Sequence, residues 1–201
     1  MSFTRIVVAI ALLVVAYVPA HAQDRGAFQA GVQFVTAHVG ELDSTDLGVS
    51  GRLSWLPTPM IGVEAELAMF PSDLPEDAPV TASRFEGLFG VTVGPQLGAV
   101  RIFGRARPGF LQFSEAPAPF PCITIFPPPL QCTLGAGHTG FALDLGGGIE
   151  ARIAPSLSLR VDLGDRMVQY PAPSIDMSGE AHDEDFYAHE FRFAVGAAWI
   201  F

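Results

Sequence analysis

The stretch "EFRFAVGAAWIF", residues 190–201, alternates large apolar side chains with small or charged ones. One set of alternate positions reads Phe191, Phe193, Val195, Ala197, Trp199 and Phe201, and the other reads Glu190, Arg192, Ala194, Gly196 and Ala198. Because successive side chains of a β-strand point to opposite sides, a period of two residues predicts a strand with two different faces. Here one face is apolar, and the other consists of small and charged side chains.

The same alternation recurs after residue 23, and it predicts eight strands. Their expected ranges are roughly 27–39, 46–56, 60–70, 84–94, 100–114, 140–153, 157–170 and 188–201. The expected connections are short at 57–59, 95–99 and 154–156, and long at 40–45, 71–83, 115–139 and 171–187. Short turns at one end and long loops at the other favour an up-and-down antiparallel sheet. Strands of this length can cross a membrane at a tilt, which takes ~9–11 residues.

The first 22 residues have the three parts of a secretory signal peptide. A short start with one charge, Arg5, precedes the apolar run 6–18, and a small-x-small site follows at 20–22. The apolar run is too short to span a bilayer, which needs ~20 residues. We therefore expect a signal peptide at 1–22 that is cleaved on export, and one domain at 23–201.

The composition of the polar faces argues against a soluble barrel. Lysine is absent, so all 11 basic residues are arginine, against 21 acids. A solvated face normally carries lysine, serine and threonine, whereas these faces combine glycine and alanine with charges of both signs. Such faces suit a narrow interior, with the large apolar side chains facing lipid and all backbone groups paired in a closed sheet. The prediction is an all-β fold: an eight-stranded antiparallel up-and-down transmembrane β-barrel.

The combination resembles the small outer-membrane β-barrels of Gram-negative bacteria, the OmpA/OmpX-like class. The resemblance covers about residues 24–201, and it is one of pattern. It implies an outer-membrane location, contact with outer-membrane lipid and lipopolysaccharide, help from the barrel-assembly machinery during biogenesis, and a monomer. In that family a final strand that ends in an aromatic residue is the assembly signal, which would be the role of Trp199 and Phe201.

Charged side chains of both signs are expected inside the barrel. The predicted lumen ion pairs involve Arg52, Glu64, Glu66, Glu86, Arg105, Arg107, Asp144, Glu150, Arg160, Asp162, Arg166 and Arg192, with Arg84, Arg101, Arg152 and Glu190 also inward. The expected loops contain acids, Asp46 among them, and no arginine. The net charge of −10 is therefore expected to reside mainly in the loops.

The turns also predict strand register. A turn centred on residue 155 places Glu150 opposite Arg160 and Asp144 opposite Arg166, and a turn centred on residue 58 places Arg52 opposite Glu64. Opposite charges across a ladder support the register. Pro108 lies within a predicted strand, where proline cannot donate to the ladder, so we expect a bulge or the membrane boundary there.

The longest loop contains both cysteines, Cys122 and Cys132, around a proline-rich segment. Two nearby cysteines in an exported chain predict a disulfide. The loop either folds onto the barrel rim or presents a small apolar docking surface. His182 and His189 lie among acids, but their spacing does not predict a metal site, and no cofactor is expected.

The function expected from these features is non-enzymatic, in envelope integrity or in surface interaction through acidic extracellular loops. The alternatives are a narrow pore or transporter for small solutes, a lipid-modifying membrane enzyme, and a soluble periplasmic lipid-binding barrel. An enzyme would need a catalytic group near the rim, where His138 with Thr139 is the nearest combination. An acidic chain with few basic residues does not fit nucleic-acid binding.

Overall fold

The computed structural model of the protein describes residues 27–40, 44–71, 83–115, 125–176 and 179–201. The predicted signal peptide at 1–22 lies outside these ranges. Eight long strands dominate the described part: β1 (Ala27–Val39), β2 (Ser44–Leu56), β3 (Ile61–Phe70), β4 (Arg84–Val93), β6 (Val100–Phe113), β7 (His138–Ala154), β8 (Leu157–Tyr170) and β11 (Phe186–Ile200). The short elements are β5 (Gln96–Leu97), α2 (Leu130–Gly135), β9 (Ser174–Ile175) and β10 (Ala181–His182).

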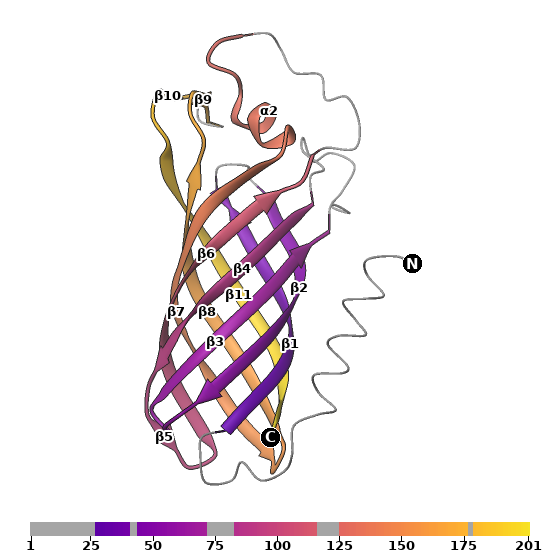
Figure 1. The fold of residues 1–201 in the computed structure, drawn as a ribbon, viewed down its shortest axis with the longest axis vertical. Coiled ribbons are helices and arrows are strands. Elements are labelled where there is room, and N and C mark those ends of the chain that lie inside the picture. Colours follow the sequence, from indigo (N-terminus) through magenta and orange to yellow (C-terminus); the bar gives the residue numbers. More distant parts are fainter. Residues whose placement is uncertain (1–26, 41–43, 72–82, 116–124, 177–178) are drawn as a thin grey trace.

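Each long strand pairs antiparallel with the next, and β1 pairs with β11, so the sheet closes into a barrel. Figure 1 shows α2, β9 and β10 together at one end of this barrel, which we call the loop end. The chain terminus at Phe201 and the short strand β5 lie at the other end, which we call the turn end. The predicted eight-stranded antiparallel barrel is therefore confirmed.

The outer surface of the barrel is an apolar belt. Every long strand has large, exposed apolar side chains at alternate positions, and Phe34 and Val32 are 72% and 71% accessible. Further members include Phe28, Leu47, Val49, Leu53, Ile61, Leu67, Met69, Phe89, Val91, Ile102, Phe141, Ile149, Leu159, Val161, Leu163, Phe191 and Val195. A continuous apolar surface of this kind requires lipid as its solvent. The soluble-barrel alternative, which needs these side chains inside, is wrong.

No helix within the described ranges is long and apolar enough to cross a membrane.

The predicted bulge at Pro108 is absent. The β4–β6 ladder has the same register on both sides of it, with Leu88 opposite Gly109 and Val91 opposite Ala106, and only the pairs between them are missing. Proline has no N–H to donate, so the ladder is interrupted without an extra residue. Glycine at 90 permits this close approach, because a Cβ there would lie 2.1 Å from the carbonyl oxygen of Ala106.

Two charged residues lie elsewhere than predicted. Arg152 is exposed near the turn end, at a register shift between Arg152 and Ala154, because the chain there is already leaving the barrel. Asp46 is part of β2 and forms an ion pair with Arg84, so it does not belong to a loop. The expected strand 46–56 already had Asp46 as its first residue, and the observed β2 begins at Ser44, so Asp46 lies inside the strand with its carboxylate paired to Arg84.

Candidate functional site: a lumen filled by arginine and carboxylate side chains

The inward positions of the barrel form a set of buried charges. All twelve residues of the predicted ion pairs are at most 7% accessible. The buried arginines are Arg52, Arg84, Arg101, Arg105, Arg107, Arg160, Arg166 and Arg192, and the buried acids are Glu64, Glu66, Glu86, Asp144, Glu150, Asp162 and Glu190. With Asp46, which contacts Arg84, the lumen carries as many acids as arginines. The charges of the lumen therefore balance.

Six of these side chains form a closed ring of alternating charge, which we call the ion-pair ring. Its contacts run from Arg160 Nη1 to Glu64 (2.8 Å), from Glu64 to Arg107 Nη1 (3.1 Å), from Arg107 Nη2 to Asp144 (2.8 Å), from Asp144 to Arg105 Nε (2.7 Å), from Arg105 Nη1 to Asp162 (2.5 Å), and from Asp162 back to Arg160 Nε (2.9 Å). Because Glu64 is on β3 and Arg160 is on β8, four strands away around the barrel, the ring crosses the full width of the lumen.

A chain of alternating charges continues from the ring towards the loop end. Arg107 Nη1 lies 2.6 Å from Glu66, and Glu66 contacts Arg192. The chain then passes through Glu86, Arg166, Glu190, Arg84 and Asp46. Every carboxylate along this path lies between two arginines, apart from the terminal Asp46. Such a filled interior fits the expectation that eight strands leave room for side chains only.

The turn end of the lumen is less tightly bonded. Arg52 lies 3.9 Å from its nearest carboxylate, that of Asp162. Arg101 donates to Thr92 Oγ1 at 3.0 Å, and no carboxylate of a described residue is within ion-pair distance of it. Near this end, the hydroxyls of Ser54 and Ser158 are buried without a hydrogen-bond partner among the described residues, and so are the side chains of Gln33 and Ser50 at the middle of β1 and β2. Buried polar groups usually find partners, so this end suits small polar molecules such as water.

The register predictions have mixed outcomes. Glu150 is opposite Arg160, and Asp144 is opposite Arg166, as predicted. Arg52 is opposite Glu66, so its predicted place opposite Glu64 is wrong by two residues. A shift of two residues keeps every side chain on the same face, so the inward pattern cannot detect it.

The ion pairs themselves mostly join strands that are not neighbours. Glu150 accepts a hydrogen bond from Gln29 Nε2 at 2.7 Å, although Arg160 is its ladder partner. Arg166 contacts Glu86 across the lumen and Glu190, its ladder partner on β11, whereas Asp144 is its ladder partner on β7. An arginine side chain is long and ends in a planar fork, so it can bridge carboxylates across a narrow interior.

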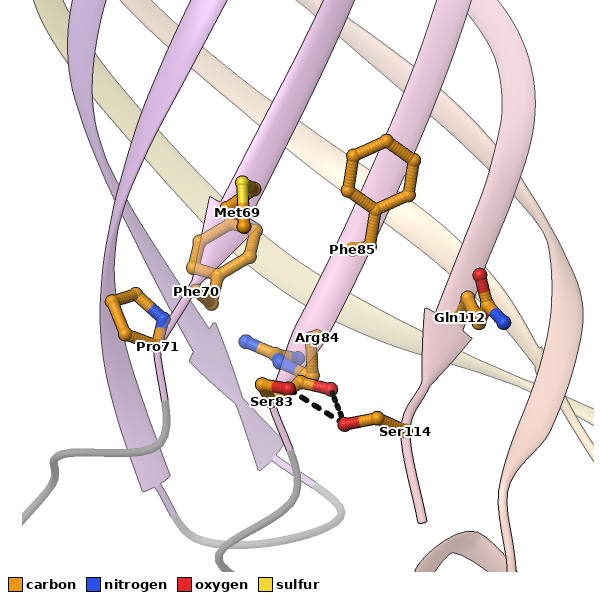
Figure 2. Close-up of a pocket in the computed structure, with 8 residues that line it drawn as sticks. All are labelled: Met69, Phe70, Pro71, Ser83, Arg84, Phe85, Gln112 and Ser114. Carbon is orange, nitrogen blue, oxygen red and sulfur yellow. Dashed lines mark hydrogen bonds between the residues drawn. The ribbon is translucent and has the colours of Figure 1, made fainter. Parts of the chain in front are cut away.

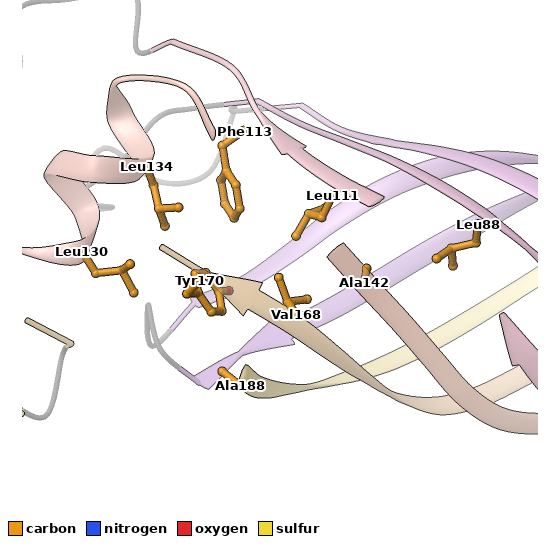
Figure 3. Packing of buried hydrophobic residues seen from close by; sticks show 9 residues of the cluster. All are labelled: Leu88, Leu111, Phe113, Leu130, Leu134, Ala142, Val168, Tyr170 and Ala188. Carbon is orange, nitrogen blue, oxygen red and sulfur yellow. The ribbon is translucent and has the colours of Figure 1, made fainter. Parts of the chain in front are cut away.

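A cluster of apolar side chains closes the lumen at the loop end, and we call it the cap cluster. It consists of Leu88, Leu111, Phe113, Leu130, Leu134, Ala142, Val168, Tyr170 and Ala188. Figure 3 shows Leu130 and Leu134 of α2 pointing towards Phe113 and Tyr170 of the barrel. The hydroxyl of Tyr170 donates to Glu190 at 2.6 Å, which joins the cap cluster to the charged chain below.

The sequence reasoning missed α2. The described part of the longest loop folds onto the rim, which was one of the two structures expected for it. The helix was not predicted, because the segment before it is rich in proline. The spacing of Leu130 and Leu134, four residues apart, is the signal that could have found it, because such residues share one face of a helix. Phe126 in the same loop is 84% accessible.

A pocket of about 350 Å³ lies at the rim beside β3, β4 and β6. Its lining comprises Met69, Phe70, Pro71, Ser83, Arg84, Phe85, Gln112 and Ser114 (Figure 2). Ser114 Oγ donates to the carbonyl oxygen of Ser83 at 2.8 Å, which fastens the start of β4 to the end of β6. The lining therefore combines the apolar side chains of Met69, Phe70 and Phe85 with the polar side chains of Ser83, Gln112 and Ser114.

Comparisons with known proteins agree with this architecture. No protein-family model matches the sequence, and no curated protein matches it either. Among solved structures, the outer membrane protein OprG from Pseudomonas aeruginosa is 13% identical, with a TM-score of 0.54 over 88% of this chain and 96% of that one. Neisserial surface protein A is 12% identical, with a TM-score of 0.52 over 88% of this chain and 97% of that one.

A major outer membrane protein from Thermus thermophilus is 15% identical, with a TM-score of 0.52 over 88% of this chain and 99% of that one. At such identities the likeness concerns the fold. The chain has the fold of the small eight-stranded outer-membrane β-barrels. In barrels of this fold, the apolar belt is the surface that faces membrane lipid.

Aromatic side chains gather at the turn end of the barrel. Phe28 stacks on Trp55 with ring centroids 6.1 Å apart, and Trp199 is 52% accessible. The backbone N–H of Phe201 donates to the carbonyl oxygen of Phe28 at 2.9 Å. Aromatic residues favour the boundary between lipid and water, so this girdle indicates one edge of the membrane. The role of Trp199 and Phe201 in assembly stays a prediction.

The remaining residues that the sequence suggested for a disulfide, a catalytic group or a metal site lie around the loop end of the barrel. Cys132 is in α2, and the described residues contain no free cysteine, but Cys122 lies outside those residues, so the disulfide stays a prediction. His138 and Thr139 are consecutive in β7 and point to opposite faces, so they cannot act on one substrate atom. His189 contacts Asp165 at 2.6 Å on the outer surface.

Proposed function

We propose that this outer-membrane barrel is a closed, non-enzymatic envelope protein that acts through its loop end, in envelope integrity or in surface interaction. The observation that supports the proposal is the ion-pair ring, since its six side chains join β3 to β6, β7 and β8 across the lumen. The cap cluster above it adds an apolar barrier. The proposed contacts are outer-membrane lipid along the apolar belt, lipopolysaccharide at the loop end through divalent cations that bridge its phosphates to the acids of the loops, and the barrel-assembly machinery during biogenesis.

A closed lumen predicts that the folded monomer has no steady conductance. Any water column would have to pass the ion-pair ring, and parting its members would leave buried charges unpaired. We expect planar bilayers with the refolded full chain to show no lasting open level at physiological salt, while a wide bacterial porin in the same bilayers conducts. A long-lived, ion-selective current from homogeneous folded monomer would contradict the closed lumen.

A narrow pore is the second candidate, and one observation favours it. The buried hydroxyls of Ser54 and Ser158 near the turn end, and the side chains of Gln33 and Ser50 midway along β1 and β2, have no partner among the described residues, so water can lie in the lumen beside them. The ion-pair ring would still have to part for a solute to cross. The conductance measurement therefore distinguishes the two candidates.

The proposed role itself is tested with a deletion strain of the source bacterium. If the protein supports the envelope, the strain should take up large antibiotics several-fold faster than its parent, and the full chain should reverse this. If it acts in surface interaction, adhesion should fall while uptake stays normal. A strain unchanged in both assays would contradict the proposal and return the enzyme alternative to consideration.

A further inference from the structure

The hairpin of β9 and β10 brings together three side chains that can ligate a metal ion. Asp176, Glu180 and His182 place one ligand atom each within 4.8 Å of one another. The sequence did not predict a metal site at His182, because the spacing of Asp176 and Glu180 before it matches no common metal-binding motif. We propose that these three residues bind a divalent transition-metal ion, with Zn²⁺ as the type case, at the mouth of the barrel.

The separation of the donor atoms fits a shared ion. His182 Nε2 lies 3.0 Å from Asp176 Oδ2. Two ligands bound to Zn²⁺ at ~2.0–2.1 Å in tetrahedral geometry lie roughly 3.3 Å apart, so this pair needs almost no movement. Glu180 is exposed on the turn between the strands, and its carboxylate has to approach the other two by at most roughly 1.5 Å to complete a three-residue set.

The imidazole is held in place by contacts outside the cluster. Its ring stacks on Phe186 with centroids 3.9 Å apart, and Phe186 packs against the cap cluster. Strand pairing places His182 opposite Ser174, which is fully buried. The ligand that favours a transition metal is therefore anchored to the barrel wall, which reduces the entropy lost on binding an ion.

The backbone orients the two carboxylates. The N–H of Glu180 donates to Asp176 Oδ1 at 2.9 Å, which leaves Oδ2 directed at the imidazole. The N–H of Asp176 donates to the carbonyl oxygen of Glu180 at 3.0 Å and closes the turn. Asp176 and Glu180 are therefore brought to the same side of the hairpin as His182.

The donor set selects the class of ion. One imidazole and two carboxylates suit Zn²⁺, Co²⁺ or Ni²⁺, whereas Ca²⁺ and Mg²⁺ prefer oxygen ligands alone. Asp183 and Glu184, exposed nearby, add negative charge and could attract any divalent cation. Preference for a transition metal over Ca²⁺ thus separates a built site from a merely acidic surface.

Titration of Zn²⁺ into the refolded full chain, stripped of metal with a chelator, tests the proposal. We expect saturable binding of one ion that persists in excess Ca²⁺, and a Co²⁺ complex with the visible absorption of low-coordinate nitrogen and oxygen ligation. His182→Ala and Asp176→Asn should weaken Zn²⁺ binding by at least about 10–100-fold, the loss that is typical when only a group supporting a ligand is removed.

Two control variants distinguish binding at this cluster from binding to any exposed imidazole or to acidic loop residues in general. His189→Ala removes an exposed imidazole that also contacts a carboxylate, that of Asp165, and it should bind Zn²⁺ as the parent does. Asp183→Asn with Glu184→Gln removes loop charge alone and should also leave binding unchanged. Absence of saturable binding, equal displacement by Ca²⁺, or equal loss in the control variants would each overturn the proposal. All variants are first checked for the folded barrel by circular dichroism.

Discussion

Replacing Arg107 by methionine is expected to destabilise the folded barrel by about 3–5 kcal/mol, the typical cost of leaving buried charges without their partner. Arg107 is fully buried and is the only arginine of the ion-pair ring that contacts three described acids: Glu64, Glu66 and Asp144. Methionine fills much of the same volume, so the loss is mainly electrostatic. Three carboxylates would then share the remaining arginines.

The measurement is reversible urea unfolding in lipid vesicles, followed by tryptophan fluorescence. Arg152→Met is the matched control, because Arg152 is exposed at the turn end and forms no ion pair among the described residues. Its replacement should change the unfolding free energy by less than about 0.5 kcal/mol. Equal effects of the two substitutions would mean that the ion-pair ring does not stabilise the barrel.

Replacing Leu134 by aspartate should release α2 from the barrel mouth. Leu134 is 0% accessible within the cap cluster, so the new carboxylate would be buried without a partner. A cost of about 3 kcal/mol would raise the population of the open loop roughly 100-fold, and cleavage by a protease follows that population. We expect proteinase K to cut this loop far faster in the variant, while the strands remain protected.

Phe126→Asp is the control for this experiment. It introduces the same charge into the same loop at a side chain that is 84% accessible, so it should leave the cleavage rate nearly unchanged. Equal cleavage of Leu134→Asp and the parent chain would show that the helix does not close the mouth. Acceleration by both substitutions would show that the charge itself, and not the lost packing, is responsible.

The strands could be predicted from the sequence because their signal is local. Every second residue from Leu157 to Leu163 is apolar and every intervening one is polar or small, so both the strand and its lipid face follow from a few positions. The pairing of Glu150 with Arg160 was also predicted correctly, although a register shift between Arg152 and Ala154, which the sequence does not show, contributes to it together with the turn.

The partners in the lumen could not be predicted because they depend on closure. Arg160 and Glu64 are 96 residues apart in the sequence. They come into contact only when the barrel closes and β8 lies across the lumen from β3. Asp46 was assigned to a loop because the sequence does not show its ion-pair partner. That partner is Arg84, at the start of β4. The metal-ligand cluster at His182 requires the two-residue strands β9 and β10, which are too short to leave a periodic pattern.

The ion-pair ring also constrains how this barrel can reach its folded state. Its members come from four strands spread between Glu64 and Asp162, and no hairpin of two neighbouring strands contains a complete set. A lone hairpin inserted into lipid would expose unpaired charges at about 2–4 kcal/mol each near the bilayer centre. Partly inserted intermediates are therefore unfavourable, and the strands should enter the membrane and close in one cooperative step, with the balanced interior as the last structure to form.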